Sequence, residues 1–129
     1  MNEKVLFRTE SRELYTAEEM KDIEKVIRVF YNYLRDSRRC ELLWSDKVGY
    51  VLLPINRKNG DRAVSPRIIR SADDLVRAII SEISGELAVN SGKKRLTKKE
   101  YPELMRYVND YMIQLPEYYN CLPATLQAV

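Results

Sequence analysis

The chain contains no histidine. Histidine is the side chain that titrates nearest to neutral pH, and its imidazole is the commonest nitrogen ligand for metals. Its absence excludes Cys–His and Ser–His nucleophile pairs and every mixed Cys/His site for zinc. The sequence therefore gives no positive support to an enzyme, and we expect no metal and no cofactor.

Glycine and cysteine are also scarce, with four glycines and two cysteines in 129 residues. The glycines form neither a P-loop nor a GxGxxG motif, which excludes the familiar nucleotide-binding loops. Cys40 and Cys121 form no CxxC motif. They are typical of structural thiols in a reducing cytoplasm, although a long-range disulfide stays open.

Long apolar runs are missing as well. No stretch approaches the roughly 18 apolar residues of a membrane span, and the first residues, MNEKVLF, reach charge too early for a signal peptide. We therefore expect a cytoplasmic protein without membrane association. The apolar fraction of 45% and the charged fraction of 32% are typical of a globular protein, and the length favours a single domain over 1–129.

The first predicted element is a helix that begins at a capping box, Thr16-Ala17-Glu18-Glu19, and runs to about Asp36. Its second half, VIRVFYNYL (26–34), has only Arg28 and Asn32 as polar residues. A helix that is apolar over most of its circumference is central to a core, or is shared between a core and a partner.

A hairpin is predicted next, from residues 41–45 and 50–55 of ELLWSDKVGYVLLPI. A four-residue turn at 46–49 would place Gly49 in the left-handed region. In this register Leu42, Trp44, Val51 and Leu53 share one face, and a shorter loop would exchange the faces. Both faces are apolar, so both need cover.

Three further elements complete the prediction. A turn at Asn59-Gly60 is predicted to lead into a third strand within residues 61–70. Pro66 should shorten this strand or confine it to the edge of the sheet. Ser71-Ala72-Asp73-Asp74 caps a second helix. A turn at 97–101 precedes a helix from Pro102 to about Leu115. The predicted fold is α+β, in the order helix, three-stranded antiparallel sheet, helix, helix, with an N-terminal arm (1–15) and a C-terminal tail (116–129) packed on the body.

The net charge of +3 is unevenly distributed. Residues 35–70 carry nine Lys or Arg against four Asp or Glu, and residues 93–106 carry six against two. Two basic segments suit a nucleic-acid or phosphate ligand, whereas solvated loops and a charged sheet edge explain them equally well. The candidate anion-binding residues are Arg57, Lys58, Arg62, Arg67, Lys93, Lys94, Arg95, Lys98 and Lys99.

Tyrosine is abundant, with nine against one tryptophan and two phenylalanines. A tyrosine joins a rigid apolar ring to a polar tip, which suits surfaces that meet other surfaces. We therefore predict a non-catalytic partner-binding or regulatory module that self-associates, a C2 homodimer being the commonest arrangement. The alternative is the nucleic-acid- or phosphate-binding protein. The interface candidates are Val26, Val29, Phe30, Tyr33, Trp44, Tyr50, Tyr118 and Tyr119.

Overall fold

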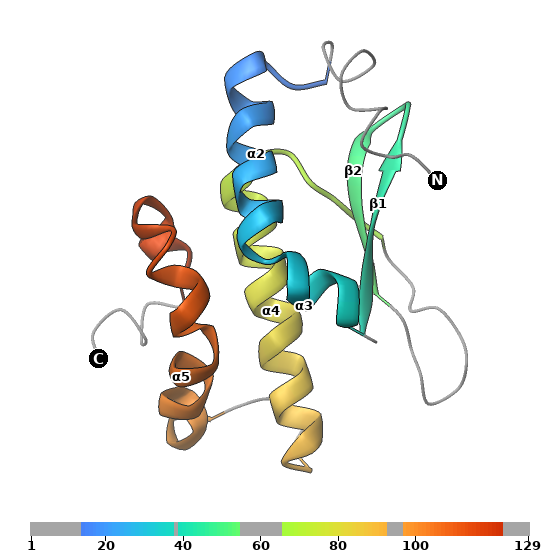
Figure 1. Cartoon of the computed structure of the whole chain (residues 1–129). Coiled ribbons are helices and arrows are strands. Elements are labelled where there is room, and N and C mark those ends of the chain that lie inside the picture. The colour runs from blue at the N-terminus through green and yellow to red at the C-terminus, as the bar shows by residue number, and fades with distance from the viewer. Residues whose placement is uncertain (1–13, 38, 55–65, 93–96, 123–129) are drawn as a thin grey trace. The chain divides into compact units, whose positions relative to one another are not determined.

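The computed structural model of the chain describes residues 14–37, 39–54, 66–92 and 97–122 (Figure 1). The chain divides into two compact units, Met1–Leu75 and Val76–Val129. Helices and a three-stranded antiparallel sheet follow in the order helix, sheet, helix, helix, which confirms the predicted α+β class. The assignment of residues 1–129 to one domain stays a prediction.

Helix α2 (Ala17–Val29) starts at the predicted capping box. The Thr16 hydroxyl accepts from the Glu19 N–H at 3.0 Å, and the Thr16 N–H donates to the Glu19 carboxylate at 3.0 Å. Two of the N–H groups that every helix start leaves without an intrahelical partner are satisfied in this way. The predicted start of the helix is confirmed.

Helix α3 (Tyr31–Asp36) continues the same path after a bend at Phe30. Phe30 has φ −93° and ψ 14°, and its side chain is fully buried. The hydrogen-bond ladder nevertheless runs through the bend, because the Phe30 N–H donates to Val26 O and the Leu34 N–H donates to Phe30 O. The helix predicted to end near Asp36 is therefore correct in extent, with one bend that the sequence did not indicate.

The sheet consists of β1 (Cys40–Ser45), β2 (Gly49–Pro54) and β3 (Arg67–Ile68), in that order. Ser45 pairs with Gly49, so only residues 46–48 lie in the turn. The predicted four-residue turn is wrong by one residue, although Gly49 does adopt the predicted left-handed conformation with φ 87°.

This shift exchanges the faces of β2, because side chains alternate along a strand. Leu42 pairs with Leu52 and Trp44 with Tyr50, so these four side chains share a face. The prediction that grouped Leu42 and Trp44 with Val51 and Leu53 is corrected. Both candidate faces of this hairpin are apolar, so the hydrophobic pattern could not choose between the two registers.

The third strand is short, as the position of Pro66 predicted, and the Asn59-Gly60 turn lies outside the described residues. Helix α4 (Ala72–Asn90) follows it. Apolar residues three and four apart form one face of this helix, and all of them are buried: Leu75, Val76, Ile79, Ile80, Ile83 and Leu87.

The second unit ends with three helical segments beyond α4: η2 (Lys98–Glu100), α5 (Tyr101–Met112) and η3 (Pro116–Cys121). Pro102 stands at the start of α5, where its missing N–H has no intrahelical role, as predicted. The predicted helix to Leu115 ends three residues earlier. In the tail Tyr118, Cys121 and Leu122 are buried, whereas residues 123–129 are outside the described part of the chain.

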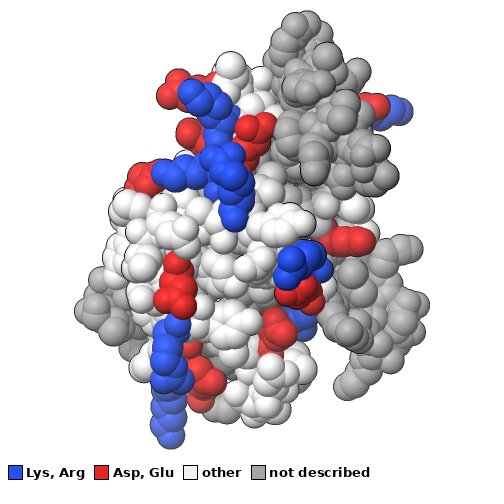
Figure 2. Space-filling view, in the orientation of Figure 1, with Lys and Arg blue, Asp and Glu red and all other residues white. Residues whose placement is uncertain are grey.

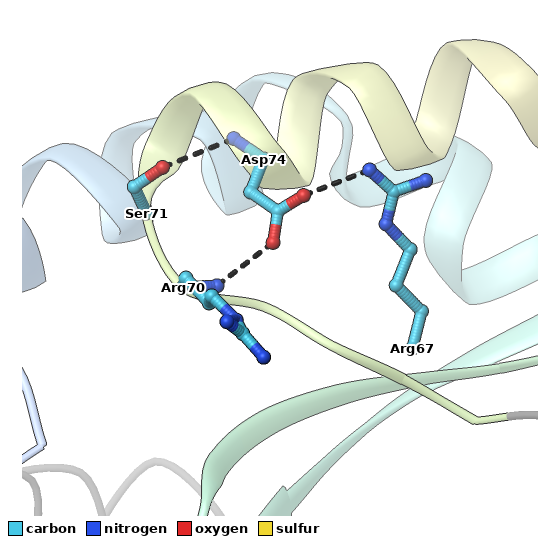
Figure 3. A network of polar contacts seen from close by, with 4 residues as sticks. All are labelled: Arg67, Arg70, Ser71 and Asp74. Carbon is cyan, nitrogen blue, oxygen red and sulfur yellow. Dashed lines mark hydrogen bonds and ion pairs between the residues drawn. The ribbon is translucent and has the colours of Figure 1, made fainter.

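Asp74 ties the segment after β3 to the start of α4 (Figure 3). Its carboxylate accepts from the Arg67 guanidinium at 2.8 Å and from the Arg70 N–H at 2.9 Å. The Ser71 hydroxyl in turn accepts from the Asp74 N–H at 3.2 Å, the N-cap bond that the sequence predicted. These contacts all lie within the first unit, and they fix the path of the chain as it leaves the sheet.

Candidate interaction groove

An open groove of about 670 Å³ lies in the first unit between the α2–α3 helices and strand β1. The chain passes from α2 through α3 directly into β1, so helix and hairpin lie beside each other (Figure 1). Its volume falls within the range of ligand and peptide sites. We call it the α2–β1 groove; its lining residues are Glu24, Ile27, Arg28, Tyr31, Leu34, Arg35, Glu41, Leu42, Leu43, Trp44 and Tyr50.

The helical wall comes from positions three and four apart on one face of α2 and α3. Ile27, Tyr31 and Leu34 supply its apolar part. Tyr31 is 53% exposed, the largest exposure of any apolar side chain on this wall. An aromatic ring of this size facing solvent beside a groove is typical of a contact surface.

The strand wall is built around Trp44, the only tryptophan of the chain. Its indole N–H donates to the Asp46 carboxylate at 3.0 Å, and its ring meets the Tyr50 ring edge-on with centroids 5.1 Å apart. Because these contacts fix the ring, the wall is preorganised. Leu43, 38% exposed, adds a second apolar group at this edge of the sheet.

The rim of the groove carries two acids, Glu24 and Glu41, and two bases, Arg28 and Arg35. Arg35 forms a double hydrogen bond with Asp36 and lies 5.6 Å from the Tyr31 ring centroid. The hydrogen bonds from Arg35 hold the pKa of Asp36 below its ordinary value. Within the described ranges, the side chains of Glu24, Arg28 and Glu41 have no ion pair or hydrogen bond.

The interface residues predicted from the sequence divide by burial. Trp44 and Val29 are half-buried and Tyr119 is exposed. Trp44 and Tyr50 line the α2–β1 groove. Five of the eight candidates, Tyr50 of the groove wall among them, are buried and present little surface to a partner, and their role at an interface stays a prediction: Val26, Phe30, Tyr33, Tyr50 and Tyr118.

The basic candidates are only partly described. Arg67 is paired with Asp74, and Lys99 is exposed. On the face seen in Figure 2, Lys and Arg side chains lie next to Asp and Glu side chains. Of Lys98 only the backbone is described, and the remaining candidates lie outside the described residues: Arg57, Lys58, Arg62, Lys93, Lys94 and Arg95.

Sequence reasoning did not single out Glu24, Ile27, Arg28 and Tyr31 as a group. The signal was present, because their spacing of three and four places them on one helical face. What the sequence did not contain was the position of β1, which turns this face into one wall of a groove.

No protein-family model, curated protein or solved structure matches the chain. Across the described segments, no group of three or more His, Cys, Asp or Glu side chains is arranged to hold a metal ion. No helix in that same portion is long and apolar enough to cross a membrane.

Proposed function

We propose that this protein is a non-catalytic, partner-binding module that self-associates, and that the second copy covers the α2–β1 groove. One observation carries the proposal: an open groove with a preformed aromatic wall has exposed apolar side chains, Tyr31 and Leu43, along its length. Removal of apolar surface of this kind from water stabilises the complex with a partner.

The charges of the groove favour a second copy as the partner. Its rim is electrically balanced, with Glu24 and Glu41 against Arg28 and Arg35. A polyanion needs a surplus of positive charge, whereas a surface with equal numbers of both signs can complement itself across a two-fold axis. Nucleic-acid binding through the basic segments stays a prediction without added support.

The state of the cysteines fits a cytoplasmic site of action. Cys40 and Cys121 are both buried, and two cysteines in 129 residues do not make a disulfide-rich scaffold. Small secreted proteins generally are rich in disulfides, whereas few, buried cysteines are typical of proteins in reducing compartments. We therefore propose that association takes place in the cytoplasm.

Sedimentation equilibrium over a range of concentrations tests the proposal. We expect a reversible dimer, and we expect Tyr31→Ser to weaken it by about tenfold through loss of apolar contact. The matched control is Tyr107→Ser on α5, which removes a similarly exposed tyrosine (45%) that does not line the groove.

Two results would contradict the proposal. One is a protein that sediments as a monomer up to about 1 mM, where even a weak specific dimer forms. The other is a dimer that Tyr107→Ser weakens as much as Tyr31→Ser does.

A further inference from the structure

Two charged side chains on the rim of the α2–β1 groove are spaced to recognise each other in a second copy. Glu24 and Arg28 are four residues apart on α2, so they lie on the same face about 6 Å apart along the helix axis. Neither has an ion-pair partner among the described residues. The pair is thus available to another chain.

We propose that two copies of the chain pack α2 against α2 in antiparallel orientation, with Glu24 of each copy paired to Arg28 of the other. The inference rests on the proposed function and specifies how the self-association is arranged. A two-fold axis that crosses α2 level with Val26, midway between the two charges, brings each carboxylate opposite a guanidinium. Parallel packing would instead place Glu24 opposite Glu24, which is repulsive.

The same axis brings a second complementary pair together. Tyr31 lies five residues after Val26 and Lys21 five residues before it, so the antiparallel arrangement sets each Tyr31 opposite Lys21 of the second copy. Tyr31 is exposed, and so is Lys21. An ammonium group over a tyrosine face is attractive. Ile27, beside the axis, supplies apolar contact between the two helices.

The contact is small, so the dimer is expected to be weak. A stable interface buries about 800 Å² on each partner, and the proposed contact involves only the 13 residues of α2 and the adjoining wall of the groove. We expect a dissociation constant on the order of 10–100 μM. At that strength the two reciprocal ion pairs decide the orientation and a measurable part of the affinity.

Charge reversal tests the arrangement with three variants: Glu24→Arg, Arg28→Glu and the double variant. Each single variant places like charges opposite each other at two symmetric sites, and we expect its dimer to weaken by about 10- to 30-fold. The double variant restores opposite charges, and we expect it to dimerise within about threefold of the unaltered chain.

A mixture of the two single variants gives the decisive measurement. The Glu24→Arg chain presents two bases and the Arg28→Glu chain presents two acids, so each is complementary to the other. We expect equimolar mixing to give a heterodimer about as stable as the unaltered dimer, as measured by sedimentation. Circular dichroism checks folding, since a like-charge pair on an exposed helix lowers the stability of that helix only slightly.

Glu103→Arg on α5 is the matched control, because Glu103 is an exposed helical acid outside the groove. It is expected to leave dimerisation unchanged. If both single variants dimerise as well as the unaltered chain does, the antiparallel pairing is wrong, whereas the proposed self-association still holds. An unaltered chain that is monomeric overturns both.

Discussion

A single hydroxyl group, that of Tyr15, connects three segments of the first unit. It accepts from the Tyr50 N–H at 2.9 Å and donates to the Ile69 carbonyl at 2.7 Å. Tyr15 precedes α2, Tyr50 is in β2, and Ile69 follows β3. Because the contacts are buried, water cannot replace the hydroxyl as a hydrogen-bond partner of either backbone group if the hydroxyl is removed.

We therefore expect Tyr15→Phe to lower the free energy of unfolding by about 2–4 kcal/mol, since it leaves a buried N–H and a buried carbonyl without this partner. Urea denaturation measures the change. Tyr107→Phe is the control, because Tyr107 is exposed and removal of its hydroxyl should change stability by less than about 0.5 kcal/mol. Equal effects of the two variants would show that the Tyr15 hydroxyl has no special role.

The same tyrosine makes the stability of the fold depend on pH in the alkaline range. Burial raises the pKa of Tyr15 above its ordinary value of 10.0. The unfolded chain therefore loses the Tyr15 proton at a lower pH than the folded chain does. The stabilisation that the protonated hydroxyl gives to the folded state is complete below pH 10.0, and it is lost as the pH rises through the pKa of the folded state. The difference in stability between the unaltered chain and Tyr15→Phe should narrow above that pH. A difference that stays constant would contradict the raised pKa.

At the scale of elements, the hairpin turn depends on a glycine and on the ring beside it. Gly49 has φ 87°, which strains any residue with a Cβ. A Cβ at this position would also meet the Tyr15 ring, with two ring carbons 2.8 Å away and the hydroxyl oxygen closer still. The ring that anchors α2 to β2 thus also restricts position 49 to glycine.

Gly49→Ala should accordingly lower the free energy of unfolding by more than backbone strain alone would. Gly92 offers a matched control, because it has φ 73° and open space where its Cβ would be. We expect Gly92→Ala to cost about 1–2 kcal/mol from its backbone conformation, and Gly49→Ala to cost a further 1–3 kcal/mol or so from overpacking. If thermal or urea denaturation shows the same loss of stability for both variants, the Tyr15 ring moves aside without an energetic penalty.

The elements also show where sequence reasoning succeeds. Thr16 and Ser71 were predicted as helix caps because a short side-chain oxygen at that position satisfies a nearby N–H, which is a local interaction. The bend at Phe30 and the three-residue turn were not predictable in this way. The turn length was left undetermined because both faces of the hairpin are apolar, so the hydrophobic pattern favours neither register.

At the scale of the molecule, the same distinction separates the predicted interface from the observed groove. Apolar residues of α2 and α3 were proposed as a surface because of their number, yet Phe30 and Tyr33 are buried. Trp44 was proposed because both faces of its hairpin are apolar and need cover, and it does line the groove. The charges of the rim matter only because β1 lies next to the helix, a long-range arrangement that a single sequence does not encode in any local pattern.

Association through the α2–β1 groove should change the surroundings of Trp44. A second copy that covers the α2–β1 groove would cover Trp44, whereas association through any other surface would leave its surroundings unchanged. Because the chain has one tryptophan, its fluorescence reports on this wall alone.

The most direct measurement is therefore the emission of Trp44, followed with acrylamide quenching as the protein concentration is raised through the range in which sedimentation shows a dimer. We expect the emission to shift to shorter wavelength and the quenching to fall in proportion to the dimer, since the indole leaves water. A mass that doubles while emission and quenching stay constant would contradict the central claim that the groove is the self-association surface.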